Sequence, residues 1–219
     1  MKNRFNNLTS KEWLPFQKSW FRYSGDEDLY RQNIRFFIKF DDEEKAPNLL
    51  FWSSENQCKT IKKLQSELNF NLYTPDTVKQ ADLLQFVFLD LRQFISSNPT
   101  LENYFKLKRE VLNLAYSLKN KLAHRRFISV LLPNIYQNNQ FYPVAWDLAK
   151  TLGSFYSLKD DKIGCVDFKN ETTKTSFFKT SESLFYSLYF RNDEKSQYND
   201  RADEYPFFKN INQQASNKL

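Results

Sequence analysis

The sequence predicts a mostly α-helical protein, a helical bundle around a long antiparallel helical hairpin, with a small β element in the N-terminal or C-terminal third. Apolar residues recur every three or four positions over 76–96 and again over 100–124. A Ser-Ser-Asn-Pro break at 96–99 separates the two runs, so the helices should pack side by side. Hydrophobic residues make up 41% of the chain, which is too many for a disordered protein.

Two helices are expected before this hairpin. A short aromatic helix over 9–24 begins at Thr9 or Ser10, either of which can cap it. Its Trp13, Phe16 and Trp20 recur at helical spacing, so they cover a core or form a partner-binding surface. A second helix is predicted over 26–40, because three acids open it and apolar residues repeat along it.

The remaining segments are less regular. Residues 49–52 are apolar and short, which suits a buried strand as well as a helical fragment. Helices are expected over 55–68 and near 144–157, and the segment 162–190 can supply strands. We expect a single helical domain over 1–210 and a disordered tail over 211–219, which is rich in Asn, Gln and Ser.

Composition excludes several classes of protein. The three glycines are isolated, so no phosphate-binding glycine loop can be formed, and no two prolines are adjacent, so the acidic-Pro-Pro-aromatic motif of DNA methyltransferases is missing. The chain is therefore not a complete methyltransferase. Two cysteines and one histidine cannot form a Cys/His zinc cluster, and we expect neither metal nor cofactor. No apolar run approaches the roughly 18 residues of a membrane span, so a cytoplasmic protein is expected.

Positive charge is concentrated in the middle of the chain. The net charge is +6, and four basic residues without an intervening acid lie at the C-terminal end of the second hairpin helix: Lys119, Lys121, Arg125 and Arg126. Such a cluster can neutralise phosphates, which predicts nucleic-acid binding by Lys121, Arg125 and Arg126. The alternative is a solvated helix end, whose cations complement the helix dipole.

The only histidine lies within this cluster. The segment Lys119-Asn120-x-x-x-His124 resembles the Arg-Asn-x-x-x-His signature of the HEPN superfamily, with lysine in place of the arginine. The resemblance implies a helical, metal-independent endoribonuclease of prokaryotic defence, in which two protomers form the cleft. It assigns catalysis to His124, Asn120 and Lys119, and it implies a homodimer acting on RNA. A lysine lacks the two-pronged donor geometry of arginine, so a degenerate, inactive form is the alternative.

The chemistry implied by this signature depends on one helix. Asn120 and His124 would share a helix face, so the amide could orient the imidazole, whose ordinary pKa near 6.5 suits proton transfer at neutral pH. Lys119 would stabilise charge on the phosphate. The structural alternative is an ordinary histidine at a helix C-terminus.

A second resemblance concerns the N-terminus. The segment from Asn6 to Phe21 is similar to the opening of some prokaryotic restriction-modification DNA methyltransferases. It implies a non-catalytic DNA- or protein-binding subunit that contacts DNA, a methyltransferase or another defence-system subunit through Trp13, Phe16 and Trp20. The sequence thus predicts a defence-associated protein that interacts with nucleic acid, and RNA and DNA both remain open.

Overall fold

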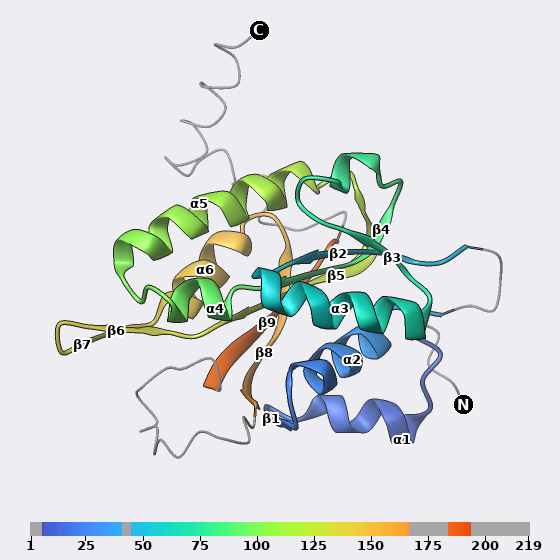
Figure 1. Cartoon of the computed structure of the whole chain (residues 1–219), viewed down its shortest axis with the longest axis horizontal. Coiled ribbons are helices and arrows are strands. Elements are labelled where there is room, and N and C mark those ends of the chain that lie inside the picture. The colour runs from blue at the N-terminus through green and yellow to red at the C-terminus, as the bar shows by residue number, and fades with distance from the viewer. Residues whose placement is uncertain (1–5, 41–44, 167–183, 194–219) are drawn as a thin grey trace, which may run out of the picture.

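The computed structural model describes residues 6–40, 45–166 and 184–193 (Figure 1). Its elements follow in the order α1 (Ser10–Trp13), η1 (Leu14–Gln17), β1 (Trp20–Tyr23), α2 (Asp26–Phe37), β2 (Asn48–Trp52), α3 (Glu55–Leu68), β3 (Asn71–Tyr73), η2 (Val78–Gln80), β4 (Leu84–Asp90), α4 (Arg92–Ser96), α5 (Leu101–Ser117), β5 (Leu122–Leu132), β6 (Ile135–Gln137), β7 (Gln140–Tyr142), α6 (Val144–Leu152), β8 (Ser157–Val166) and β9 (Leu184–Arg191). The labels η1 and η2 denote 3-10 helices.

A seven-stranded mixed sheet organises these elements, in the order β1-β8-β9-β5-β4-β2-β3. Strands β3, β2, β4 and β5 are mutually parallel, whereas β9 runs antiparallel to both β5 and β8. Strand β1 adds to the outer edge, parallel to β8, and β6 and β7 form a separate hairpin. The prediction of a mostly α-helical bundle is therefore wrong, because the protein has an α/β fold.

The first half of the predicted helical hairpin is not one helix, and its longest element is the strand β4. Residues 76–96 form η2, β4 and α4, and β4 lies between β2 and β5. From Phe86 to Asp90 every residue is buried. A central parallel strand covered on both faces is almost continuously apolar, and such a run contains every-third-or-fourth spacings by necessity. The helix-like spacing of apolar residues over 76–96 results from this continuous run of apolar residues.

The second half of the hairpin ends earlier than predicted. Helix α5 begins after Thr100, whose side chain accepts a hydrogen bond from the Asn103 amide (3.2 Å), and it ends at Ser117. A turn over 118–121 leads into β5, which pairs with β4 and β9. Residues 128–132 are all buried between these neighbours, so packing within the sheet determines their conformation.

The short helix predicted over 9–24 is wrong, because that segment forms α1, η1 and strand β1, but several other predicted segments are confirmed. Helix α3 spans the predicted 55–68, α2 covers most of 26–40, and α6 covers the first part of 144–157. The ambiguous segment 49–52 lies in strand β2. Strand β8 overlaps the start of 162–190, and β9 overlaps its end. The predicted tail over 211–219 lies outside the described residues.

Helices cover both faces of the sheet, and each face has its own core (Figure 1). Helices α5 and α6 pack with Leu50, Val87 and Val130 on one face. Helices α2 and α3 pack on the other face, where much of the core is aromatic. There Phe37 stacks on Phe86, with ring centroids 5.0 Å apart. None of the described helices is long and apolar enough to cross a membrane.

Candidate ligand-binding site

The strand order reverses at β2. The chain passes from β2 through α3 to β3 on one side, and then returns to β4 on the other side of β2. In open α/β sheets, ligands bind outside the carboxyl ends of the strands at such a switch point, because the connecting helices diverge there. The carboxyl ends of β2, β3 and β4 are therefore the first place to look for a site.

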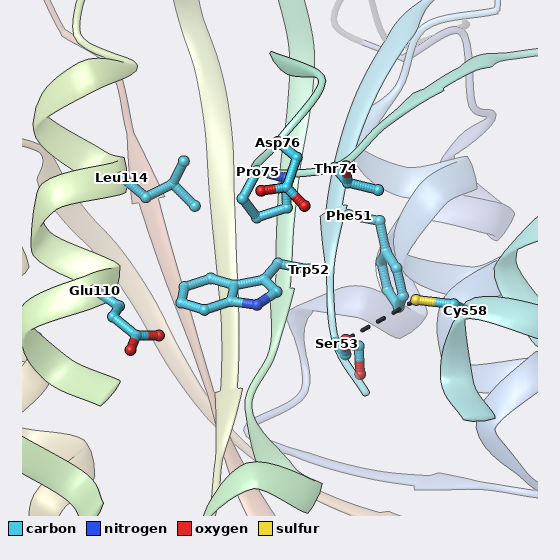
Figure 2. A pocket seen from close by; sticks show the side chains of 9 residues that line it. All are labelled: Phe51, Trp52, Ser53, Cys58, Thr74, Pro75, Asp76, Glu110 and Leu114. Carbon is cyan, nitrogen blue, oxygen red and sulfur yellow. Dashed lines mark hydrogen bonds between the residues drawn. The ribbon is translucent and has the colours of Figure 1, made fainter. Parts of the chain in front are cut away.

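A pocket of about 470 Å³ lies at the carboxyl ends of β2 and β3 (Figure 2). This volume is within the range of small-molecule sites. The pocket extends across the end of β2, from α3 on one face of the sheet to α5 on the other. Its lining residues are Phe51, Trp52, Ser53, Cys58, Thr74, Pro75, Asp76, Glu110 and Leu114. We call it the switch-point pocket.

The charged residues that line the switch-point pocket are both acidic. Asp76 belongs to the turn that follows β3, where the Thr74 amide donates to Thr77 Oγ1 (2.9 Å) and the Val78 amide donates to the Thr74 carbonyl (2.9 Å). These bonds fix the turn. Glu110 comes from α5, on the opposite side of the pocket. The side chains can therefore accept hydrogen bonds from hydroxyl or amino groups of a ligand.

An indole separates these two acids. Trp52 is partly buried, and its ring lies between α5 and the Thr74–Asp76 turn (Figure 2). The Phe94 ring supports it from α4, with centroids 6.0 Å apart. A supported indole of this kind offers a flat apolar surface for a ring or a cation.

The cysteine in the pocket is not an activated nucleophile. The Cys58 thiol donates to the Ser53 carbonyl (3.9 Å), as Figure 2 shows, and burial raises the pKa of this thiol. It therefore stays protonated near neutral pH. No group of three or more His, Cys, Asp or Glu within 6–40, 45–166 and 184–193 is arranged to hold a metal ion.

Side-chain hydrogen bonds link the segment that follows β2 to the helix that follows β4. The Ser54 hydroxyl contacts the side-chain amides of Gln57 and Gln93, so it links the segment after β2 to α4. Glu55 then opens α3 with a negative charge. A carboxylate in the first turn opposes anion binding at a helix N-terminus, so Glu55 does not favour a phosphate group here.

A buried ion-pair network occupies the carboxyl end of β4. Arg92 Nε donates to Asp90 Oδ1 (2.8 Å) and its Nη2 donates to Oδ2 (2.7 Å), while the Tyr30 hydroxyl donates to Oδ2 (2.5 Å). Arg92 Nη2 also reaches Asp26 (2.7 Å), and the guanidinium lies 4.7 Å from the centre of the Phe185 ring. The side chains of Arg92 and Asp90 are 1% and 0% exposed. Both oxygens of Asp90 are thus engaged within the protein.

This network also changes proton affinities. Burial raises the pKa of Tyr30 well above its ordinary value, and the neighbouring Asp90 carboxylate adds to that shift. Burial disfavours the Arg92 cation, but Asp90 together with Asp26 outweighs this effect and raises the pKa of Arg92. The arginine therefore remains charged and the tyrosine remains protonated at any ordinary pH.

The predicted catalytic residues do not share a helix face. Lys119 and Asn120 lie in the turn after α5, whereas His124 lies in β5, and all three are exposed. An i,i+4 pairing of Asn120 with His124 requires a helix that the structure replaces with a turn and a strand. Together with the α/β fold, this removes the structural basis of the HEPN resemblance.

The predicted nucleic-acid residues have different surroundings. Lys121 Nζ donates to three carbonyls of the η2 segment: Val78, Lys79 and Ala81 (3.2, 2.9 and 2.9 Å). Arg125 is exposed and has a φ of 60°, and its amide donates to the Asn192 carbonyl (2.7 Å). The Asn192 amide in turn donates to the Arg126 carbonyl (2.9 Å). Lys121 thus links the turn before β5 to η2. The backbone of β5 is irregular at Arg125, where it is held by hydrogen bonds to Asn192, and the Arg125 side chain is exposed.

The predicted partner-binding aromatics lie at the edge of the sheet that β1 forms. Trp20, on β1, is 53% exposed, while Trp13 and Phe16 are half-buried. Phe16 stacks on Phe36 with centroids 4.1 Å apart, and the Lys162 ammonium donates to the Phe16 carbonyl. Phe16 is therefore part of the packing, and Trp20 is the residue of the three that is most available to a partner.

Sequence reasoning missed the switch-point pocket. The helix predicted over 76–96 begins at Asp76, whereas Asp76 lies in the turn that follows β3. The available signal was an Asp in a Pro-containing turn directly after a short apolar strand. Glu110 had no signal, because its approach depends on how α5 packs over the sheet.

Comparisons with known proteins support only a general likeness. No protein-family profile matches the chain, and no curated protein matches it. Among solved structures, TrmN from Thermus thermophilus has a TM-score of 0.42 and 7% identity, covering 78% of this chain and 42% of that one. TehB from Haemophilus influenzae has a TM-score of 0.39 and 7% identity, covering 85% of this chain and 63% of that one. The chain thus spans less than two thirds of either protein.

Another protein from Thermus thermophilus that is assigned as a DNA modification methylase, solved with S-adenosyl-L-methionine, has a TM-score of 0.34 and 9% identity. It matches over 81% of this chain and 55% of its own length. A methyltransferase from Pyrococcus furiosus is also similar, with a TM-score of 0.36 and 14% identity over 80% of this chain and 74% of that one. The function of this chain is therefore argued from its own side chains.

Proposed function

We propose that this chain is a non-catalytic, methyltransferase-like α/β protein that binds a nucleoside-class ligand in the switch-point pocket. The observation that carries the proposal is the position of Asp76, at the carboxyl end of β3 beside a topological switch point. In dinucleotide-binding sheets, an acid roughly 20 residues after the first strand turn accepts hydrogen bonds from ribose hydroxyls. Asp76 occupies a comparable place after β2 and α3.

The rest of the pocket suits the same ligand class. The indole of Trp52 offers a face on which a base can stack, and Ser53 and Thr74 add hydroxyl groups along the wall. The contact between Ser54 and Gln93 and the Glu55 carboxylate at the start of α3 disfavour a phosphate. These features favour a nucleoside or a nucleoside thioether over a nucleotide.

The non-catalytic part of the proposal rests on Asp90. A carboxylate at the carboxyl end of β4 is the natural position for a group that accepts a proton or polarises a substrate amine. Here Arg92 binds both of its oxygens and Tyr30 binds one of them, in a buried setting. An acceptor engaged in this way is not available to a substrate.

Isothermal titration of the full chain with S-adenosylmethionine, S-adenosylhomocysteine and adenosine tests ligand binding. Asp76→Asn should weaken binding about tenfold, because hydrogen bonds to a charged group are worth about 1.5–3 kcal/mol. Asp82→Asn is the matched control, since Asp82 is also exposed but lines a different pocket, at the amino ends of the strands. Failure of all three ligands to bind, or equal effects of the two variants, would refute the proposal.

A second proposal concerns a macromolecular partner. We propose that the chain acts beside a DNA restriction-modification methyltransferase and contacts DNA through Lys119 and Arg125. The favouring observation is that the side chains of Lys119 and Arg125 are both exposed, while the Arg125 backbone, with a φ of 60°, is held by its hydrogen bond to the Asn192 carbonyl. Such cations contribute through phosphate neutralisation.

Measuring the salt dependence of DNA binding tests this second proposal. The double variant Lys119→Ala/Arg125→Ala should lower the slope of log K against log salt by about one to two. Lys106→Ala is the control, because Lys106 pairs with Glu102 on α5. An unchanged slope would exclude these contacts, and loss of methyltransferase binding only in Trp20→Ala would indicate a protein interface instead.

A further inference from the structure

We propose that the hairpin of β6 and β7 is a self-association surface, through which two copies of this chain form a symmetric dimer. In the described part of the chain, these two strands pair only with each other. The hairpin projects from the body of the fold near the start of α5 (Figure 1). None of the residues that line the switch-point pocket belongs to it.

The two faces of the hairpin have different surroundings. Ile135 pairs with Tyr142 across the strands, and both pack in the core that α5 and α6 cover. Tyr136 pairs with Phe141 at the next position, so these two rings lie on the opposite face. They are 43% and 44% exposed. A two-stranded hairpin with an aromatic pair in water is stabilised when a partner covers that face.

The hairpin is already ordered for binding. Asn138 and Asn139 have φ values of 53° and 59°, both positive as a tight type I′ turn requires. The Leu101 amide at the start of α5 donates to Gln137 Oε1 (3.1 Å). Association therefore loses little conformational entropy in this segment.

The chemistry of the hairpin fits a second copy. No charged residue occurs between Arg126 and Asp147, although 26% of the chain is charged. A two-fold interface places a surface against itself, so like charges would meet in it, and here there are none. Asn, Gln and Tyr side chains each donate and accept hydrogen bonds, so they can pair with their own copies. Nucleic acid is disfavoured, because the hairpin offers no cation to a phosphate.

Charges beside the hairpin are neutralised within each copy. Glu102, next to Leu101, pairs with Lys106 (2.8 Å). Asp147 pairs with Lys108 (2.6 Å). Two copies can therefore approach here with little repulsion, even though the net charge of the chain is +6.

The helices that hold the hairpin extend the apolar surface. Phe105 lies one turn after Leu101 on α5, and Trp146 follows Ala145, whose amide donates to Asn134 Oδ1 (3.1 Å). Their side chains are 53% and 48% exposed. A stable interface buries about 800 Å² on each partner, so we expect the dimer to cover these rings as well.

Sedimentation velocity of the full chain from low to high micromolar concentration tests the proposal. The chain should pass from monomer to dimer. Phe141→Lys should raise the dissociation constant about 100-fold, because each of the two copies loses an aromatic contact worth about tenfold. Tyr136→Lys, on the opposing strand, should act in the same direction. Leu83→Lys is the matched control, since Leu83 is 56% exposed before β4, and it should leave the dissociation constant unchanged.

Mixing two variants separates a lost contact from a lost fold. Phe141→Lys and Phe141→Glu should each dimerise poorly, whereas an equal mixture should dimerise more tightly than either, because opposite charges then meet across the interface. Thermal unfolding of the dilute monomers should give the same midpoint for Phe141→Lys and Leu83→Lys. A monomer at every concentration, equal effects of the Phe141 and Leu83 variants on dimerisation, or no gain on mixing would overturn the proposal.

Discussion

Replacing Arg92 with methionine tests whether the carboxylate of Asp90 depends on its internal partner. Methionine resembles arginine in length and in helix propensity, so the substitution removes the guanidinium with little change in the intrinsic stability of α4. It deletes both hydrogen bonds to Asp90 and the bond to Asp26. Asp90 would then be fully buried, with the Tyr30 hydroxyl as a remaining donor.

The expected loss is large because the charge is left without a partner. Removing one member of a buried ion pair costs about 3–5 kcal/mol, and a typical domain has about 5–15 kcal/mol of stability in total. Asp90 is 0% exposed, so water cannot replace the guanidinium without local opening of the structure. We expect Arg92→Met to lose about 4 kcal/mol, with the unpaired Asp90 carboxylate as the main cause.

Urea unfolding followed by circular dichroism measures this loss, provided that the denaturant slope is unchanged. The double variant Asp90→Asn/Arg92→Met should be more stable than Arg92→Met alone, because it removes the unpaired charge. Tyr30→Phe should cost less than Arg92→Met, since it deletes one hydrogen bond and leaves the ion pair intact. A loss below about 1 kcal/mol in Arg92→Met, or a double variant that is no better than the single one, would refute the reasoning.

Three further predictions concern stability. Gly164→Ala should lose about 1–3 kcal/mol in thermal unfolding, because its Cβ would lie 2.4 Å from the Phe185 ring, and an unchanged midpoint would contradict this. Burial raises the pKa of five tyrosines, which ionise above pH 10 only in the unfolded chain. The free energy of unfolding should therefore fall by up to about 7 kcal/mol per pH unit above pH 10. A constant free energy of unfolding from pH 10 to 11 would contradict this prediction. The five tyrosines are Tyr23, Tyr30, Tyr104, Tyr156 and Tyr189. Burial alone would raise the pKa of Asp193, but hydrogen bonds from Arg191 and Lys159 outweigh burial and lower this pKa to about 2. The stabilisation from the Asp193 carboxylate should therefore be lost as the pH falls from 3.8 towards 2. Asp193→Asn should remove that part of the acid transition.

The parts of the fold that sequence could predict are those with a polar face. Helices α2 and α3 each bury one side and expose the other, so their apolar period appears directly in the sequence. Strand β4 has no such contrast, because it lies between two strands and under helices on both faces. Periodicity cannot distinguish a segment of this kind from a buried helix, and the whole fold class depended on it.

The candidate site was hidden for a related reason. Asp76 and Glu110 are 34 positions apart in the sequence and meet only because β3 and α5 end up on either side of Trp52. No local spacing encodes that meeting. By contrast, the signature around His124 is local and visible, but its proposed chemistry required a helix that ends at Ser117. A short motif predicts a site only if its secondary structure is predicted correctly as well.

The carboxyl ends of the strands differ in whether their carboxylates are engaged within the protein. At β3 and β2 the pocket is open, with two carboxylates that have no cation beside them in the described residues and an indole in position. At β4, the next strand in the sheet order, Arg92 and Tyr30 engage both oxygens of Asp90. Under the proposed function, the pocket at β3 and β2 would determine ligand affinity, and the engaged Asp90 would leave the end of β4 without a free carboxylate. Substitutions at Asp76 should therefore change binding with little effect on stability, and substitutions at Arg92 should change stability before they change binding.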